Sequence, residues 1–174
     1  MKINRKAGLA LTGCAAGLAL VASVSGTSAS AAPLPLAASG TYYQLTNNHS
    51  GMCAGVSGRK TSGAPVVIEG CTGNPDREWR RVQFNTHVGQ WASIQNKYSG
   101  LCLGAPGDWA AARLAEYRCT SSPNQLWAVV PYSGGGTMVN EQSGMCLSVD
   151  AAKTAPATPV TEFYCGNYVD QTWH

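Results

Sequence analysis

Six cysteines occur along the chain in three pairs, and cysteine sulfur can either form disulfides or bind a metal ion. The pairs are Cys53 and Cys71, Cys102 and Cys119, and Cys146 and Cys165, with spacings of 18, 17 and 19 residues. Zinc sites usually contain closely spaced ligands such as Cys-x-x-Cys, but no Cys-x-x-Cys occurs here and the three histidines are scattered. The pattern therefore favours disulfides, and we expect no metal site.

The residue types needed for catalysis are present, but they form no recognisable frame. His49 lies in a predicted turn and His174 is the last residue; no Gly-x-Ser-x-Gly motif or metal-ligand spacing accompanies them or His87. The nine acidic residues are spread along the chain, and no two of them form a recognisable glycosidase pair. We therefore expect a protein that is not an enzyme and needs no cofactor.

The cysteines belong to an internal repeat. The pattern Asn-x-x-Ser-Gly-(Met/Leu)-Cys occurs at residues 47–53, 96–102 and 140–146. Repeats of this length indicate similar supersecondary units that pack together. Each unit contains one motif cysteine and one downstream cysteine, and similar units should close in the same way. Six cysteines allow fifteen connectivities, but the repeat predicts three local bridges. These are Cys53–Cys71, Cys102–Cys119 and Cys146–Cys165.

Short strands separated by Gly- and Pro-rich turns make up each predicted unit. We expect the units at about residues 41–83, 89–131 and 136–174. Each begins with a short strand, turns at Ser-Gly and continues with a strand that starts at the motif cysteine. The stretch Trp109–Tyr117 is rich in Ala and Leu, but within the repeat we interpret it as a loop followed by a strand. The chain is therefore predicted to be all-β.

A tryptophan ends each unit, and this favours one particular all-β architecture. The three residues are Trp79, Trp127 and Trp173. Three units are too few for a β-propeller, which usually has 4–8 blades. A β-trefoil, a threefold barrel capped by hairpins, suits both the number of units and the length. One large apolar side chain per unit would fill its axis, so we expect these tryptophans in the core.

The first 31 residues have the features of a secretory signal peptide. Basic residues lie within the first six positions, residues 7–24 are almost free of polar side chains, and Ala29-Ser30-Ala31 fits a cleavage site. A transmembrane anchor is the competing interpretation, but the apolar run is short and interrupted by glycine. Leu11-Thr12-Gly13-Cys14 also resembles a lipoprotein processing site. We expect a soluble extracellular protein, attached to a membrane only if Cys14 is lipidated.

Without the leader, the chain is one domain with no net charge. Residues 32–40 form a short flexible lead, and 41–174 form the domain. The leader contains three of the twelve Lys and Arg residues and none of the nine acids, so the remainder has nine of each. A neutral surface gives no electrostatic reason to bind nucleic acid or an anionic membrane, and we expect neither partner.

The repeats resemble the ricin-type β-trefoil lectins, a family that includes carbohydrate-binding modules attached to bacterial glycosidases. The resemblance covers nearly all of residues 41–174. It rests on Ser-Gly-x-Cys after a short strand, a second cysteine about 18 residues later, and the Gln-x-Trp at Gln125–Trp127 and Gln171–Trp173. The first repeat departs from it with Arg77-Glu78-Trp79. The resemblance implies up to one shallow pocket per repeat, usually for galactose-like or xylan-type sugars.

In that family, three positions of each repeat contact the sugar. An aromatic ring two residues before the second cysteine stacks on the pyranose, an aspartate two residues after the first cysteine accepts hydrogen bonds, and an asparagine before Gln-x-Trp completes the pocket. The aspartate position holds Gly55, Gly104 and Ser148, the aromatic position holds Glu69, Tyr117 and Phe163, and the asparagine position holds Asp76, Asn124 and Asp170. No repeat keeps the aspartate, so the resemblance predicts degenerate pockets.

The second repeat keeps most of the family pocket. It has Tyr117, Asn124 and Gln125, whereas the third repeat keeps a ring at Phe163 and the first keeps none of the three contacts. We expect the first repeat to be structural. We also expect the amides of Gln125 and Gln171 to bond to backbone groups.

Two other acids could replace the missing aspartate. Asp108 lies six residues after Cys102, and Asp150 lies four residues after Cys146. Asp108 also precedes Trp109, which lies outside the repeat pattern. An acid beside a ring in a loop suits a sugar platform, and the alternative is a partly buried loop tryptophan.

These features predict a secreted, non-catalytic, lectin-like protein that binds glycans or polysaccharides. We expect Tyr117 to stack on the sugar and Asn124 and Asp108 to bond its hydroxyls. The alternative is a trefoil that has lost sugar binding and binds a protein, as an inhibitor or toxin component. An acid and a ring in one pocket would favour sugar, whereas an exposed apolar patch elsewhere would favour a protein partner.

Overall fold

The computed structural model describes residues 40–82, 91–132 and 134–174. The predicted leader with Cys14, the lead as far as residue 39, His87 and the unit boundaries at 83 and 89 lie outside these residues. The described part contains only short strands and short 3-10 helices.

The first two repeats have the same order of elements, and the third differs from them by an additional 3-10 helix, one long strand in place of two short ones, and no strand after its last 3-10 helix. The first repeat contains β1 (Tyr43–Gln44), β2 (Cys53–Gly55), β3 (Ala64–Pro65), β4 (Val67–Glu69), η1 (Pro75–Arg77) and β5 (Glu78–Val82). The second contains β6 (Ser93–Asn96), β7 (Cys102–Gly104), β8 (Ala112–Arg113), β9 (Ala115–Tyr117), η2 (Pro123–Gln125) and β10 (Trp127–Tyr132). The third contains β11 (Gly135–Asn140), β12 (Cys146–Val149), η3 (Asp150–Ala152), β13 (Thr158–Phe163) and η4 (Val169–Gln171).

The predicted strands and disulfides are present. Strands β2, β7 and β12 each start at the motif cysteine, and Trp109–Tyr117 forms a loop followed by β8 and β9 rather than a helix. The disulfides join Cys53 to Cys71, Cys102 to Cys119, and Cys146 to Cys165. The predicted all-β fold with one local disulfide per repeat is confirmed.

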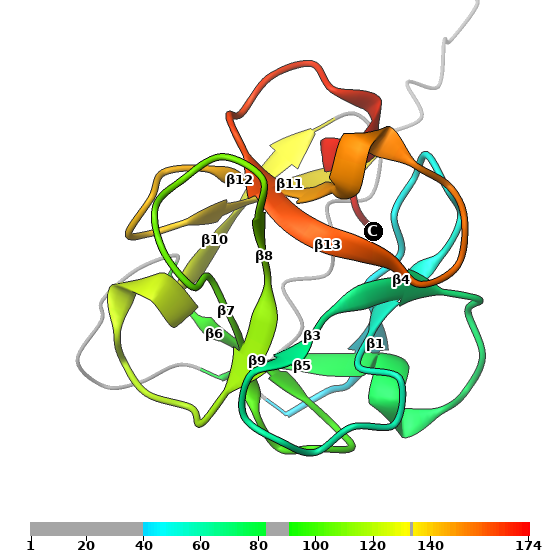
Figure 1. Ribbon diagram of the computed structural model, residues 1–174, viewed down its shortest axis with the longest axis vertical. Coiled ribbons are helices and arrows are strands. Elements are labelled where there is room, and N and C mark those ends of the chain that lie inside the picture. Colours follow the sequence, from blue (N-terminus) through cyan, green and yellow to red (C-terminus); the bar gives the residue numbers. More distant parts are fainter. Residues whose placement is uncertain (1–39, 83–90, 133) are drawn as a thin grey trace, which may run out of the picture.

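A ring of three backbone hydrogen bonds joins the repeats at the centre of the molecule. Val66 N donates to Leu114 O (3.0 Å), Leu114 N to Val160 O (2.9 Å) and Val160 N to Val66 O (2.9 Å). Strand pairs β3–β9, β8–β13 and β13–β4 also link one repeat to the next. Figure 1 shows the three repeats as three lobes around the region where these strands meet. This is the threefold arrangement of a β-trefoil.

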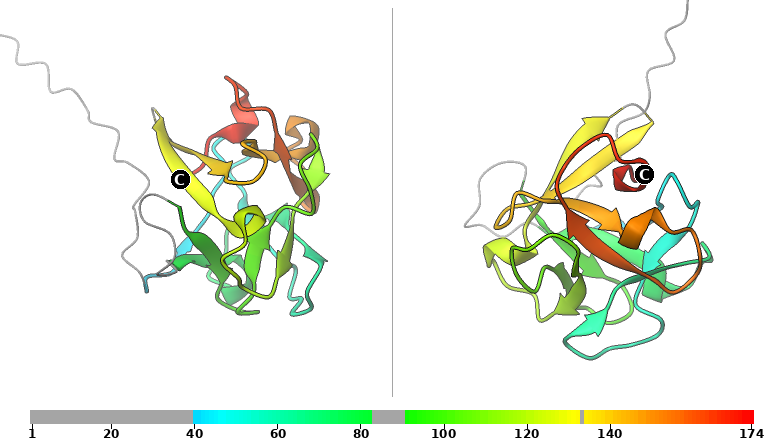
Figure 2. Two further views of the ribbon diagram at one scale, coloured as in Figure 1. Left: turned by 90° about the vertical axis from the view of Figure 1, so that its left-hand side faces the viewer. Right: turned by 45° about the horizontal axis from the view of Figure 1, so that its top comes forward.

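Strand pairing extends from this centre into two sheets. One has the order β1-β5-β6-β7-β9-β3 and the other β10-β11-β12-β13-β4-β2. The longest hairpin joins β10 to β11, with Trp127 opposite Asn140 and Tyr132 opposite Gly135. Figure 2 shows this hairpin, in yellow, at one edge of the molecule.

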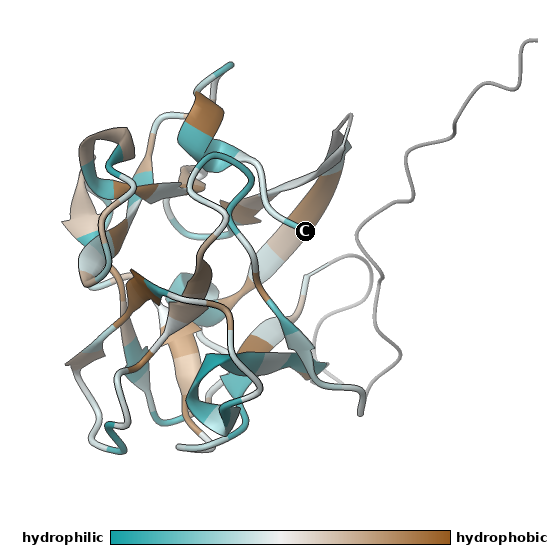
Figure 3. Ribbon diagram, turned by 90° about the vertical axis from the view of Figure 1, so that its right-hand side faces the viewer, coloured by the Kyte–Doolittle hydropathy of each residue, from teal (hydrophilic) through white to brown (hydrophobic). Residues whose placement is uncertain are grey.

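The repeat-ending tryptophans fill the core, as predicted, and all three are fully buried. Each indole N–H donates to a carbonyl of the strand that follows the motif cysteine. The pairs are Trp79 with Ala54 (2.8 Å), Trp127 with Leu103 (3.1 Å) and Trp173 with Leu147 (3.1 Å). A buried indole N–H usually needs such a partner. Hydrophobic residues lie mainly along the strands, and most loops are pale or hydrophilic (Figure 3).

The repeated motif is fixed because its residues build the same turn three times. Gly51, Gly100 and Gly144 have φ of 65°, 72° and 66°, in the left-handed region that favours glycine. The motif asparagine caps the turn, since its Oδ1 accepts from the serine backbone N–H at 3.1, 3.2 and 3.2 Å.

No helix within the described ranges has the length and apolar character needed to cross a membrane.

Candidate functional site

A pocket of about 370 Å³ lies in the third repeat, between β12, β13, η3 and η4. Its wall contains two of the predicted site residues, Asp150 and Phe163, together with Ser148 and Asp170 at the family's other two contact positions. Tyr168, which no motif singled out, completes the wall. Two acids and two aromatic rings therefore line one pocket, the arrangement that favours sugar over a protein partner.

A carboxylate stands at the base of this pocket although Ser148 replaces the family aspartate. The Ser148 hydroxyl donates to Asp170 Oδ2, and Val149 N donates to the same oxygen at 2.9 Å. Asp170 is buried, with 5% of its surface exposed, and it lines the pocket. Its second oxygen, Oδ1, has no hydrogen bond to any described residue. Compared with the family pattern, the acid is therefore on η4 and not on β12.

Two aromatic rings, those of Phe163 and Tyr168, also line the pocket. Phe163 lies edge-on to Tyr168, with ring centroids 5.7 Å apart and an interplanar angle of 82°. Tyr164 contacts Phe163 in a similar way at 5.4 Å. Tyr168 and Tyr164 are 49% and 62% exposed. Such edge-to-face contacts hold a ring in place, so Tyr168 presents a fixed surface to the solvent.

The second repeat contributes to the rim of this pocket. Ala111 lines it, and Ala111 N donates to Glu162 O of β13 at 2.8 Å. Trp109, two residues earlier, is 56% exposed, and its ring lies directly against the Gly107 Cα, where a Cβ would overlap it. Asp108 acts electrostatically on Glu162. The loop that carries the predicted Asp108–Trp109 pair therefore approaches the third repeat.

Asp150 lines the pocket and forms an ion pair with Lys153 (3.0 Å). Both side chains are partly exposed, so the pair is screened by solvent. The ion pair therefore orients the Asp150 carboxylate but is weak enough for the carboxylate to accept hydrogen bonds from a ligand.

In the second repeat, the predicted site residues Tyr117 and Gln125 lie close together, but their own side chains fill the space beside Gly104. A Cβ on Gly104 would meet the ring of Tyr117 at 2.8 Å and Gln125 Cγ at 3.1 Å. The Tyr117 ring thus packs onto the backbone position where the family aspartate stands, and burial raises the pKa of its hydroxyl. Asn124 donates through Nδ2 to Ala105 O (2.9 Å).

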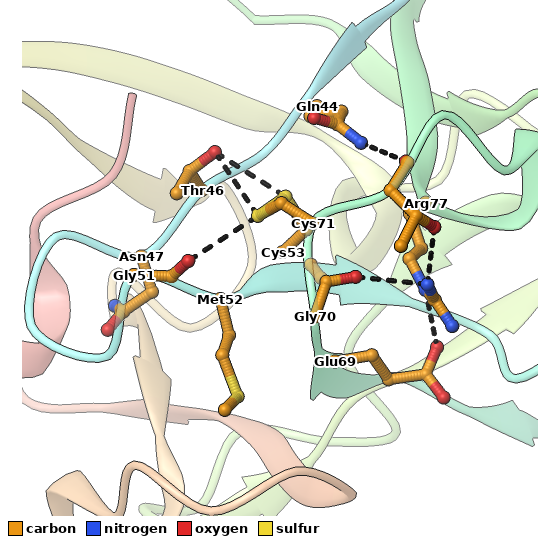
Figure 4. Close-up of a disulfide and its surroundings, with 12 residues drawn as sticks. Gln44, Thr46, Asn47, Gly51, Met52, Cys53, Glu69, Gly70, Cys71 and Arg77 are labelled. Atoms are coloured by element: carbon orange, nitrogen blue, oxygen red, sulfur yellow. Dashed lines mark hydrogen bonds and ion pairs between the residues drawn. A yellow bond between two sulfur atoms is a disulfide. The ribbon is translucent and has the colours of Figure 1, made fainter.

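The first repeat is closed by an ion pair. Arg77 Nε and Glu69 Oε2 lie 3.0 Å apart, and a Cβ on Gly55 would meet Arg77 Cγ at 2.8 Å and Glu69 Oε2 at 2.9 Å. Ser57 Oγ donates to the other oxygen of Glu69 (2.8 Å). Figure 4 shows Arg77 reaching both Glu69 and Gly70. These contacts fill the space beside Gly55, and a purely structural role for this repeat stays a prediction.

The glutamine of Gln-x-Trp braces the loop after the second cysteine. Gln125 accepts from Thr120 N (2.9 Å) and donates to Arg118 O (3.1 Å). Gln171 accepts from Gly166 N (3.1 Å) and donates to Tyr164 O (2.9 Å). Both amides are therefore used within the protein, bonding to backbone as expected.

Arg77 performs the same task in the first repeat. Its Nη1 donates to Gly70 O (3.0 Å), which is equivalent to the two carbonyls that the glutamines reach, and to Thr72 Oγ1 (2.6 Å). In the first repeat, Arg77 therefore replaces the glutamine of Gln-x-Trp and makes the equivalent hydrogen bond to the backbone.

Each motif asparagine also holds the pocket backbone of the preceding repeat. Asn47 Nδ2 donates to Asp170 O (2.7 Å), and Asn96 Nδ2 to Asp76 O (3.0 Å). Asn140 Nδ2 donates to Asn124 O (3.1 Å). The scaffold motif of the first repeat thus positions the acid of the third-repeat pocket.

Two buried glutamates outside the pocket secure the motif turns. Ser99 Oγ donates to Glu116 Oε2 (2.5 Å), and Ser143 Oγ to Glu162 Oε2 (2.7 Å). Burial raises the pKa of Glu116 to about 7, against the hydrogen bond from Ser99. Burial also raises the pKa of Glu162; the bond from Ser143 opposes this and the charge of Asp108 reinforces it.

Within the described ranges, no cluster of three or more His, Cys, Asp or Glu side chains is arranged to hold a metal ion.

Comparison with known proteins agrees with the repeat and the fold. A family model described as a ricin-type beta-trefoil lectin domain matches residues 41–173. No curated protein matches the sequence. Among solved structures, the designed threefold-symmetric protein ThreeFoil is 25% identical, with a TM-score of 0.72 over 76% of this chain and 96% of that chain.

Two natural proteins share the fold at lower identity. The exo-beta-1,3-galactanase from Clostridium thermocellum is 22% identical, with a TM-score of 0.73 over 80% of this chain and 30% of the enzyme. The ricin B-like lectin of Macrolepiota procera, solved in complex with lactose, is 19% identical, with a TM-score of 0.66 over 78% of this chain and 94% of the lectin.

Proposed function

From the premise that the chain belongs to the ricin-type β-trefoil lectin family, we propose that it binds carbohydrate without catalysis, through the pocket of its third repeat. Family membership supports carbohydrate binding in general. The choice of pocket depends on the open space beside Ser148 and Asp170, since Arg77 and Tyr117 fill the equivalent space in the other two repeats.

One observation carries this proposal: the pocket has an acceptor for hydroxyls and a ring for the pyranose face. Asp170 Oδ1 is available as an acceptor, and Asp150 is a second acid in the lining. Phe163 and Tyr168 supply aromatic surface. A few fixed polar groups beside apolar walls are what a polar small-molecule site requires.

The remaining properties of the proposed function extend the same interpretation. We infer a secreted protein whose ligands are galactose-type or xylan-type sugars, with pockets that are degenerate in the first and second repeats. The lactose complex of the Macrolepiota procera lectin and the galactan substrate class named for the bacterial enzyme support galactosides as the first probes. We expect the protein in the culture medium, with an N-terminus at Ala32 by N-terminal sequencing; a protein that stays in the cells would contradict secretion, and another N-terminus would contradict the cleavage site.

The test is a glycan array followed by calorimetry with galactose, lactose and xylobiose. Phe163→Ala should lower the affinity for the bound sugar at least about tenfold, because the stacking surface is lost. Tyr98→Ala removes an exposed ring outside the pocket and should leave the affinity unchanged. If Tyr117→Ala alone abolishes binding, the site is in the second repeat. Silence across the array, with all three disulfides intact, would overturn the sugar-binding proposal.

The alternative function, binding of a protein, requires an exposed apolar patch away from the pockets. Three of the exposed large apolar or aromatic side chains, Tyr164, Tyr168 and Val169, instead lie on the loop and helix that border the third-repeat pocket. The position of these side chains therefore favours sugar.

A further inference from the structure

A second, smaller cavity adjoins the third-repeat pocket. It measures about 210 Å³ and is lined by Thr137, Gly166, Asn167, Tyr168, Val169 and Thr172. Tyr168 is common to both walls. None of the family's three contact positions contributes to this cavity.

Tyr168 separates the two cavities as a fixed partition. Phe163 packs against it from one direction. On another side, the ring lies so close to Gly166 that a Cβ there would meet Tyr168 Cε2 at 2.8 Å. The ring is therefore held between an aromatic neighbour and a residue without a side chain, while about half of the surface of Tyr168 is exposed.

The lining of the smaller cavity suits a second polar ring. Asn167 and Thr172 have side chains without a hydrogen bond to any described residue. Thr137 Oγ1 donates to Gln171 O (3.2 Å) and keeps its lone pairs. Val169, which is 59% exposed, adds apolar surface. Donors, acceptors and an apolar face thus surround the far side of Tyr168.

The volumes of the two cavities determine whether each can bind a ligand by itself. Small-molecule sites are usually about 300–1,000 Å³. The third-repeat pocket is at the low end of this range, and the second cavity falls below it, so the second cavity would not hold a ligand by itself. Next to an occupied pocket it needs to hold only an extension of the same ligand.

We propose that the third-repeat site has two subsites and that its ligand is at least a disaccharide, with one unit beside Asp170 and the next across Tyr168, against Asn167 and Thr172. This inference rests on the proposed function and makes it more specific. The site selects a chain of sugars rather than a single terminal unit, because the contacts of the second subsite are realised only by a longer ligand.

Calorimetry with matched ligands tests the second subsite. The probes are galactose against lactose and β-1,3-galactobiose, and xylose against xylobiose. One disaccharide should bind about tenfold or more tighter than its monosaccharide, the gain expected from one or two additional hydrogen bonds and a ring contact. Asn167→Ala should reduce this ratio toward one. Gln142→Ala, which removes an exposed amide on the motif turn of the same repeat, should not change it.

The outcomes separate the two proposals. If mono- and disaccharides bind with equal affinity, the second subsite is overturned and sugar binding by the first pocket stands. If no probe binds, the proposed function itself is contradicted. If a disaccharide binds more tightly but Asn167→Ala leaves the ratio unchanged, the second unit lies elsewhere and the assignment of Asn167 and Thr172 fails.

Discussion

At the scale of single residues, the third-repeat pocket contains a carboxylate, but at a different position from the family's aspartate. Ser148 stands where the family has aspartate, and Asp170 stands where it has asparagine. Because the Ser148 hydroxyl and Val149 N both donate to Asp170 Oδ2, the carboxylate is held by neighbours that a charged group prefers. Losing the family aspartate therefore does not remove the charged acceptor from this pocket.

The position of this acid can be tested with one single and one double variant. Asp170→Asn should weaken sugar binding roughly 10- to 150-fold, since a hydrogen bond to a charged group contributes about 1.5–3 kcal/mol. The double variant Ser148→Asp with Asp170→Asn restores the family order and should recover most of the affinity. Calorimetry of both variants checks this. Equal affinities for the wild type and Asp170→Asn would show that the carboxylate makes no contact with the sugar.

Glu116 predicts how stability depends on pH. Its folded pKa of about 7 lies above the ordinary value of 4.5, so the folded state keeps a proton that the unfolded state releases between these values. The contribution of this carboxyl to the free energy of unfolding should therefore be fully present at pH 4.5 and below, and should fall by about 1–3 kcal/mol as the pH rises from 4.5 to 7. Glu162, whose pKa is raised for the same reason, adds to this trend.

Urea unfolding at pH 4.5, 6 and 8 measures this dependence. Glu116→Gln keeps a group that Ser99 can bond and removes the charge, so it should be more stable than the wild type at pH 8 and similar at pH 4.5. Glu78→Gln, which breaks an ion pair with Lys97 (2.5 Å), should give no such gain. Stability that rises from pH 4.5 to 8 in the wild type would contradict the assignment.

At the scale of elements, a glutamine links η2 and η4 to the loop that precedes each of them. In the third repeat this loop carries Tyr164 and Tyr168, so Gln171 supports the binding surface without touching the pocket. Gln125 makes the same two bonds in the second repeat. The pair therefore provides a matched comparison.

Gln171→Ala and Gln125→Ala should each lower the free energy of unfolding by about 1–3 kcal/mol, because each leaves two backbone groups without a partner. Only Gln171→Ala should also weaken sugar binding, since only it releases the loop with Tyr168. Thermal unfolding and calorimetry on both variants measure the two effects. Equal losses of affinity would place the sugar near both repeats.

The elements also show what sequence could predict. The motif, the cysteine spacings and the tryptophans specify local turns, local bridges and one large core residue per unit, and these recur wherever the chain repeats. The state of each pocket depends on contacts between positions far apart in sequence. Tyr117 is the aromatic residue that the family pattern expects, but its ring packs on Gly104 and fills the space of the pocket. Asp170 departs from the family pattern, but it accepts a hydrogen bond from Ser148 and supplies a carboxylate to the pocket.

Tyr168 was missed because it occupies no motif position. The available signal was the concentration of aromatic residues in one segment, since Phe163, Tyr164 and Tyr168 occur within six positions. Asp108 and Trp109 were assigned to the second repeat from their sequence position, whereas the fold brings their loop to β13 through Ala111 and Glu162. Spacing within one repeat could not reveal a pocket shared between two.

At the scale of the whole molecule, each repeat is completed by its neighbours. The ring of Val66, Leu114 and Val160 needs all three repeats, and Thr46 and His174 exchange backbone hydrogen bonds (2.8 and 2.9 Å) between the first and the third. Asn47 of the first repeat also donates a hydrogen bond to the Asp170 backbone carbonyl, next to the third-repeat pocket. No repeat has its full set of partners alone, and unfolding should therefore be cooperative.

This interdependence predicts a common response to the loss of any one disulfide. Replacing both cysteines of one repeat by serine opens a loop of 17–19 residues, which should cost about 3 kcal/mol in the chain-entropy model. Since the three loops are similar and the repeats unfold together, the three double variants should show a single urea transition with similar shifts. A transition that splits in two when the bridge of one repeat is removed would mean that this repeat unfolds alone, and the hydrogen-bond ring would not then determine cooperativity.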